Sequence, residues 1–271
     1  MKRISIIIIL AVIFSAFTGD EGLYRPVLHN SYKPGERLEF KLRMGIFTVG
    51  QAEMIVDDAI YRKNNRPCHK IDIYGRTASW ISWISKVEDQ WGAYVDKEAV
   101  IPHMTYRNIR EGRYRKNEEI YFDHEKNEVE AKVINRKTGM WKPSKYYPVP
   151  KDVRDMISGL VYLRTVDFEK YKPGDRIRID AFFEDAVYDF YLVYKKKEVI
   201  KTKIGKVNAI KLIPEMPENK VFDGENSVVV WISDDPNHIP LRFEAKMFLG
   251  SAGVDITDFS GLPHPISIVE K

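Results

Sequence analysis

The stretch Tyr32-Lys33-Pro34-Gly35-Glu36-Arg37-Leu38 occurs a second time in the chain, as Tyr171-Lys172-Pro173-Gly174-Asp175-Arg176-Ile177, 139 residues later. Two further pairs of segments match in the same order and at nearly the same spacing: 68–73 with 208–213, and 96–102 with 234–240. These ordered matches predict an ancient duplication. Its halves are residues 31–134 and 170–260, joined by a linker and helix at 135–169. A period this long indicates two pseudo-symmetric halves rather than a solenoid.

Each half has the residue pattern of antiparallel β-structure. After the first Lys-Pro-Gly turn, apolar residues from Leu38 to Ile46 alternate with polar residues and Gly45. A period of two is typical of a strand with one buried and one exposed face. Further strand-like runs are found at 117–123, 128–134, 177–183, 187–194, 198–204, 207–213, 227–233, 239–249 and 254–259. Between two of these runs, the three lysines at 195–197 are predicted to form an exposed hairpin tip.

Two segments break the β pattern and predict helices. Residues 152–164 place apolar side chains at helical spacing between the two halves, with Asp152 positioned to cap the helix. Residues 80–87 show the i, i+1, i+3, i+4, i+7 pattern of a short amphipathic helix. The predicted fold class is therefore mainly β, with a central helix and a short amphipathic helix.

The N-terminal segment predicts export. Lys2 and Arg3 precede an apolar run that ends in small residues, as in a secretory signal, and the run is shorter than an ordinary membrane span. We expect residues 1–19 to be a signal peptide, with an uncleaved anchor as the alternative, and residues 20–271 to form a single β-rich domain without a stable transmembrane span. The expected location is the periplasm or another exported compartment. Cys68, the single cysteine, has no partner for an internal disulfide, and it is expected to be a buried thiol because it lies in an alternating strand-like run.

Composition and motifs exclude several classes of protein. The 271 residues are 44% hydrophobic, which excludes intrinsic disorder, and a net charge of +4 spread along the chain gives no reason to expect nucleic-acid binding. Motifs such as G-x-S-x-G, H-E-x-x-H and the Walker loop are missing. The six histidines are scattered, so a zinc site would have to assemble in space from distant residues. We therefore expect no enzymatic activity, no cofactor and no metal.

The segment 230–244, with Trp231, Asp234 and Pro240-Leu241-Arg242, resembles a hairpin of periplasmic lipoprotein-sorting and lipoprotein-carrier proteins. The chain is similar in three features to an exported bacterial domain-of-unknown-function family, number 3108. These features are the Tyr32–Arg37 opening, the middle helix with Leu163-Arg164 and this hairpin. The resemblance to the carriers implies a strongly curved antiparallel sheet, an incomplete barrel that wraps around helices and closes over an apolar cavity for acyl chains. It implies no catalytic residues.

The leading functional hypothesis is a periplasmic protein that binds or carries an apolar ligand, such as a lipid or the acyl chain of a lipoprotein. The candidate ligand-binding residues are Trp80, Trp83 and Ile84 for a lid, and Phe40, Leu42, Met44 and Trp91 for the cavity wall. The same seven side chains could instead fill a solid core, because alternation does not distinguish a filled interior from a lined one. The alternative function is an envelope structural or scaffolding protein that binds another protein or a glycan through its surface. An enzyme is the third hypothesis.

Overall fold

The structure is a computed structural model that describes residues 23–84, 86–215, 227–247 and 250–270. The expected signal peptide lies outside these ranges. Within them, α2 (Met156–Leu163) is the longest helix, and no helix has the length and hydropathy needed to cross a membrane.

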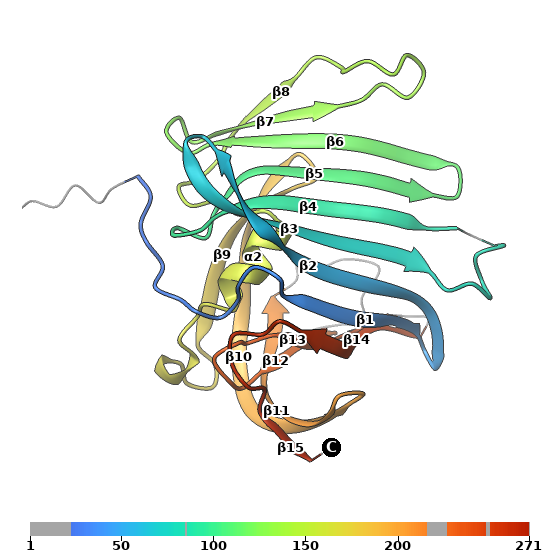
Figure 1. Cartoon of the computed structure of the whole chain (residues 1–271), viewed down its shortest axis with the longest axis vertical. Coiled ribbons are helices and arrows are strands. Elements are labelled where there is room, and N and C mark those ends of the chain that lie inside the picture. Colours follow the sequence, from blue (N-terminus) through green and yellow to red (C-terminus); the bar gives the residue numbers. More distant parts are fainter. Residues whose placement is uncertain (1–22, 85, 216–226, 248–249, 271) are drawn as a thin grey trace, which may run out of the picture.

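The first half of the chain folds as an antiparallel meander in which each strand pairs with the next (Figure 1). Its strands are β1 (Arg37–Met44), β2 (Phe47–Lys63), β3 (Arg66–Thr77), β4 (Glu88–Asp96), β5 (Pro102–Glu111), β6 (Tyr114–Asp123), β7 (Glu128–Val133) and β8 (Lys145–Pro148).

The second half continues the same sheet in the opposite order. It begins with a 3-10 turn, η2 (Phe168–Lys170), followed by β9 (Arg176–Phe183), β10 (Ala186–Thr202), β11 (Gly205–Glu215), β12 (Val228–Ser233), β13 (Pro240–Lys246), β14 (Ser251–Ser260) and β15 (Ile268–Glu270). Strand β14 pairs with β1, and β15 pairs with β11, so β8 and β9 are the two edges of one 15-stranded sheet. The expected antiparallel sheet that does not close into a barrel is confirmed.

The two halves repeat the same local hydrogen bonds. After the first Lys-Pro-Gly turn, the N–H of Gly35 donates to the carbonyl of Val56 at 2.9 Å, and Gly174 donates in the same way to Tyr194 at 2.8 Å. Strands β2 and β10, each the second strand after its turn, are both 17 residues long. These features are what a duplication would leave, and the common origin of the halves stays a prediction.

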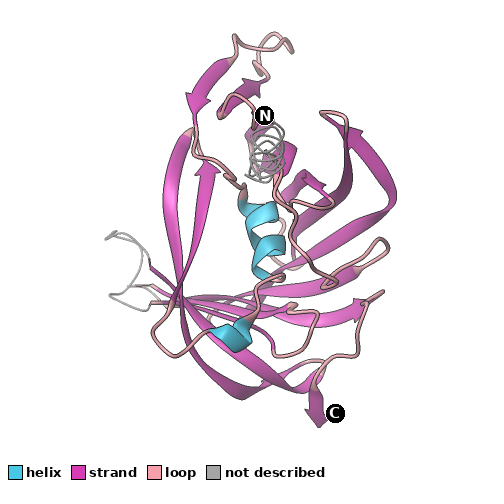
Figure 2. Ribbon diagram, turned by 90° about the vertical axis from the view of Figure 1, so that its left-hand side faces the viewer, coloured by secondary structure: helices cyan, strands magenta, loops and turns pink. Residues whose placement is uncertain are grey.

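Helix α2 lies inside the curve of the strands (Figure 2). Its N-cap is Asp155, which accepts hydrogen bonds from the backbone of Ile157 and Ser158, while Ser158 Oγ accepts from the Asp155 N–H. The expectation that Asp152 caps the helix is therefore wrong. Asp152 has a φ of 57°, outside the helix, and the chain from Asp152 to Asp155 first makes a parallel bridge to β9 through Arg154.

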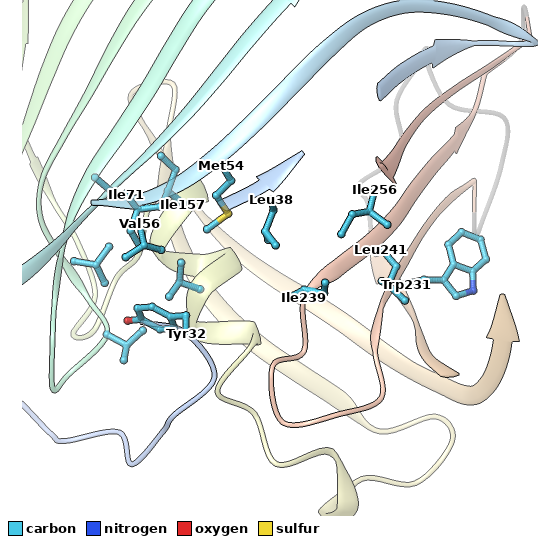
Figure 3. Packing of buried hydrophobic residues seen from close by; sticks show 14 of the residues in the cluster. Tyr32, Leu38, Met54, Val56, Ile71, Ile157, Trp231, Ile239, Leu241 and Ile256 are labelled. Atoms are coloured by element: carbon cyan, nitrogen blue, oxygen red, sulfur yellow. The ribbon is translucent and has the colours of Figure 1, made fainter. Parts of the chain in front are cut away.

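The main core cluster joins both halves to the helix. Met54, Ile71 and Ile157 pack in the same cluster as Leu241 and Ile256 (Figure 3). At full burial such side chains contribute about 1.5–3 kcal/mol each to the free energy of folding. Residues of both halves therefore pack together in this cluster, beside two smaller clusters, and the single domain over residues 20–271 stays a prediction.

The C-terminal end of α2 is held by a buried ion pair. The Arg164 guanidinium makes two hydrogen bonds to the Glu36 carboxylate, at 2.5 and 2.9 Å, and both side chains are almost completely buried. Arg164 also donates to the carbonyls of Ser31 and Asn237, at 2.6 and 2.9 Å. The first turn of the sheet, the helix and the β12–β13 connection therefore meet at one side chain.

The prediction for the three lysines at 195–197 is wrong. They do not form a hairpin tip but lie inside β10, which runs unbroken past them. A register shift between Tyr194 and Lys196 disturbs the alternation at this point. Such a bulge places consecutive polar residues in a continuous strand, which a strict period of two does not anticipate.

Candidate functional site

Residues 79–84 form consecutive turns, so the predicted amphipathic helix at 80–87 is absent from the described part of this segment. The N–H of Ile84 donates to the carbonyl of Ile81 at 3.0 Å, a turn-type bond rather than an i to i+4 ladder. The indole N–H of Trp80 donates to the carbonyl of Thr48 at 2.8 Å, and that of Trp83 to the carbonyl of Trp80 at 3.0 Å. These bonds fix the β3–β4 loop against the start of β2.

Large apolar side chains are exposed at two adjoining turns of the sheet. We call this group the apolar tip; it consists of Met44, Ile46 and Phe47 from the β1–β2 turn and Trp80, Trp83 and Ile84 from the β3–β4 loop. The two turns contact each other, since the rings of Phe47 and Trp80 lie 6.3 Å apart. Exposure reaches 89% for Ile46 and 81% for Trp83. Contiguous exposed apolar groups of this kind mark interaction sites on soluble proteins.

The expected lid residues are thus together at the surface, and each is more than half exposed. Met44, expected in the cavity wall, is also exposed in the apolar tip. The alternation predicts a strand through Ile46, whereas Ile46 lies in the turn after β1. Phe47 lies outside the alternating series. The signal for both was the apolar pair directly after Gly45, since apolar residues at a turn have no sheet face on which to be buried.

A basic turn lies beside the apolar tip. We use this name for Arg113, Tyr114 and Arg115 at the β5–β6 connection, all of which are exposed. The connection is joined to the β3–β4 loop because the N–H of Gly112 donates to the carbonyl of Lys86 at 2.8 Å. Figure 1 shows the β1–β2, β3–β4 and β5–β6 connections at the same end of the strands.

The other three expected wall residues, Phe40, Leu42 and Trp91, are partly buried. Trp91 stacks on Phe183 with ring centroids 6.1 Å apart, and the Arg107 guanidinium lies 5.1 Å from its ring. The hollow bordered by Trp91 and Phe183 measures about 20 Å³. Sites for drug-sized ligands measure roughly 300–1,000 Å³, so this hollow is far smaller than a site for such a ligand.

Burial shifts the pKa values of His69 and Cys68. Burial lowers the pKa of His69 to about 4, helped by the nearby charge of Lys97. The Cys68 thiol is buried as expected, and burial raises its pKa to about 11, which disfavours the reactive thiolate. Within the described ranges, no cluster of three or more His, Cys, Asp or Glu side chains could hold a metal ion.

The sequence and the fold can be compared with known proteins. Residues 39–257 match the family described as "Protein of unknown function (DUF3108)". The chain belongs to this family. No curated protein matches this DUF3108 chain.

Among solved structures, the DUF3108 chain is similar to a β-barrel-like protein of the DUF1849 family from Brucella abortus. The TM-score is 0.52 at 10% sequence identity, over 84% of this chain and 98% of that one. Weaker similarity is found to a Bacteroides fragilis protein described provisionally as exported, with a YmcC-like fold (TM-score 0.34, 8% identity, 87% and 100% covered). A Parabacteroides distasonis protein described provisionally as a lipoprotein has a TM-score of 0.31 (12% identity, 87% and 98% covered). The first likeness supports the barrel-like fold.

Proposed function

We propose that this chain is a non-enzymatic exported protein that binds lipid, and that the apolar tip makes the contact. The observation that carries the proposal is the exposure of six large apolar side chains at two adjoining turns. Burying a side chain of this size is worth about 1.5–3 kcal/mol. A lipid surface that covered several of them would therefore offset the cost of association.

The composition of the tip favours a lipid surface over a protein partner. Indole rings are enriched at the boundary between acyl chains and headgroups, where one end of the ring is apolar and the other polar. Here both indole N–H groups are already bonded to backbone carbonyls, so they can enter an apolar medium without losing a partner. The adjacent basic turn adds attraction to anionic headgroups.

We therefore place the lipid contact at the end of the sheet rather than in a cavity inside the sheet. The small size of the hollow beside Trp91 supports this choice, as does the exposure of the lid residues Trp80, Trp83 and Ile84. The alternative is an envelope scaffold that uses the same tip to bind another protein.

Co-sedimentation with vesicles of phosphatidylethanolamine and phosphatidylglycerol tests the proposal. We expect the wild-type protein to sediment with the vesicles and a Trp83→Asp, Ile46→Asp variant to stay in solution with an unchanged melting temperature. The matched control, Leu28→Asp with Val199→Asp, changes two exposed apolar residues outside the tip and should still bind. Equal sedimentation of all three proteins, or no binding by the wild type, would overturn the lipid proposal and favour the scaffold.

A further inference from the structure

A second surface feature lies on the outer face of the first half of the sheet and borders the apolar tip, since Thr48, which accepts the Trp80 indole hydrogen bond, is among its lining residues. An open groove of about 1,020 Å³ crosses strands β1 to β6 there. We call it the outer groove; the residues that carry the argument are Gln51, Tyr74, Arg76, Gln90, Asn108 and Asn117. Its volume is at the upper end of the range for small-molecule sites.

The groove residues lie on one face because they are cross-strand neighbours. Tyr74 is directly opposite Gln90, Gln90 is opposite Asn108, and Asn108 is opposite Asn117. Directly opposed residues share a face of a sheet, whereas the residues next in sequence, Ile73 and Trp91, pack against the core. The groove is therefore built by strand register on the side of the sheet that faces away from α2.

A chain of side-chain amides forms the floor of the groove. Asn117 Nδ2 donates to Asn108 Oδ1 at 2.7 Å, and Asn108 Nδ2 donates to Gln90 Oε1 at 3.1 Å. Gln90 Nε2 donates to the buried carboxylate of Asp72 at 3.1 Å and to the Tyr74 hydroxyl at 3.3 Å. Since an ionised carboxylate only accepts hydrogen bonds, Asp72 fixes the orientation of the Gln90 amide, and each amide then orients the next.

The ordered amides keep spare hydrogen-bonding capacity. A primary amide has two N–H donors and an oxygen with two lone pairs. Asn108 uses one donor and one lone pair within the chain of amides, and Asn117 uses a single donor. Both therefore retain a donor and an acceptor, in orientations set before a ligand arrives. Sugar hydroxyl groups, which donate and accept at the same atom, match such pairs.

Aromatic rings lie on the same face of the sheet as the amides. Tyr74 lines the groove with 39% of its surface exposed. Tyr106, whose hydroxyl donates to Asp72, lies 6.2 Å from Tyr94, and Tyr94 lies 5.4 Å from Tyr61. An exposed ring offers a flat apolar platform for the C–H face of a sugar ring, while its hydroxyl stays hydrogen-bonded.

The charges in the groove balance, which decides between ligand classes. Four basic and four acidic side chains line it. Arg37 is paired with Glu53, and Arg76 donates to Gln51 Oε1 at 3.0 Å. A polyanion such as a nucleic acid needs a surplus of cations, and a lipid chain needs an apolar floor. An uncharged polar ligand needs neither a surplus of cations nor an apolar floor.

We propose that the outer groove binds an uncharged oligosaccharide. The amides of Asn108 and Asn117 bond to its hydroxyl groups, and Tyr74 stacks against one of its rings. The residues that carry the site lie on the sheet face and none of them belongs to the apolar tip, although Thr48 adjoins both surfaces.

Isothermal titration calorimetry with maltohexaose, cellohexaose and chitohexaose tests this site. We expect at least one of them to bind, and Asn108→Ala and Tyr74→Ala each to weaken binding by about tenfold or more. Tyr188→Ala, at an exposed tyrosine of β10 outside the groove, is the matched control and should bind as the wild type does. Melting curves of the variants show that the sheet is intact.

Three results would overturn the proposal: no binding of the three oligosaccharides at millimolar concentration, tighter binding of the acidic polymer polygalacturonate, or undiminished affinity in both groove variants. The outcome is separate from that of the lipid proposal. Tyr74→Ala should leave vesicle binding unchanged, and the Trp83→Asp, Ile46→Asp variant should leave oligosaccharide binding unchanged.

Discussion

Arg164 connects parts of the chain that are more than 70 residues apart in sequence, through Glu36, Ser31 and Asn237. Removing one partner of a buried ion pair leaves an uncompensated charge, which typically costs about 3–5 kcal/mol. We therefore expect Arg164→Met to lower the free energy of unfolding by about that amount in urea titrations.

A double variant tests this explanation of the Arg164 effect. Arg164→Met with Glu36→Leu removes both charges, so it should be more stable than Arg164→Met alone. Arg176→Met, which breaks the exposed pair with Glu215, is the matched control and should change stability by less than about 1 kcal/mol. If the double variant were as unstable as the sum of the two single variants, the pair would not be the reason for the loss.

His69 should make the protein sensitive to acid. In the folded state its pKa is about 4, below the ordinary 6.5, because burial disfavours the charged ring. As pH falls below 6.5 the unfolded chain takes up a proton that the folded chain does not. Stability should therefore fall by up to about 1.4 kcal/mol per pH unit from this residue. In urea titrations between pH 6.5 and 5, His69→Phe should show a shallower loss than the wild type; an identical slope would contradict the assignment.

At the scale of single elements, the Lys-Pro-Gly turns of the two halves should respond alike to mutation. Gly35 and Gly174 have φ values of 81° and 101°, a region that costs other residues about 1–2 kcal/mol. A Cβ at Gly35 would come within 2.8 Å of Asp58 Oδ1, but this exposed carboxylate can rotate away. Gly35→Ala and Gly174→Ala should therefore destabilise the protein equally in thermal melts. Gly75→Ala is the control, because a Cβ at this strand position would have no neighbouring atom within 4 Å. Unequal losses of stability in the two turn variants would show that the turns differ.

Element boundaries followed from the sequence where alternation and turn residues agreed, as in β7, β12 and the hairpin from β12 to β13. The prediction failed where one pattern fitted two structures. Trp80, Trp83 and Ile84 have helical spacing, but their side chains stay largely exposed, and hydrogen bonds to Thr48 and Trp80 shape the segment instead. The outer groove could not be predicted, because Gln90 meets Asn108 and Tyr74 only through the register of three strands.

At the scale of the whole molecule, side chains of the β9–β10 turn connect the second half of the sheet with strands of the first half. Glu184, in the β9–β10 turn, forms ion pairs with Arg107 of β5 and Lys116 of β6, and Asp185 pairs with Lys145 of β8 at 2.9 Å. The stacked rings of Trp91 and Phe183 lie beside these pairs. Ion pairs therefore link the β9–β10 turn to strands β5, β6 and β8 across the open side of the sheet.

The placement of the apolar tip and the basic turn at one end predicts how the protein rests on a membrane. Each basic residue near an anionic surface contributes about 1 kcal/mol to binding. In co-sedimentation with the same vesicles, Arg113→Ala with Arg115→Ala should weaken binding by about 30-fold at low ionic strength and much less in 1 M salt, where screening shortens the electrostatic range to about 3 Å. Lys97→Ala with Lys126→Ala, at the opposite ends of β5 and β6, should bind as the wild type does. If the two double variants weakened vesicle binding equally, net charge rather than the orientation set by the apolar tip would govern binding.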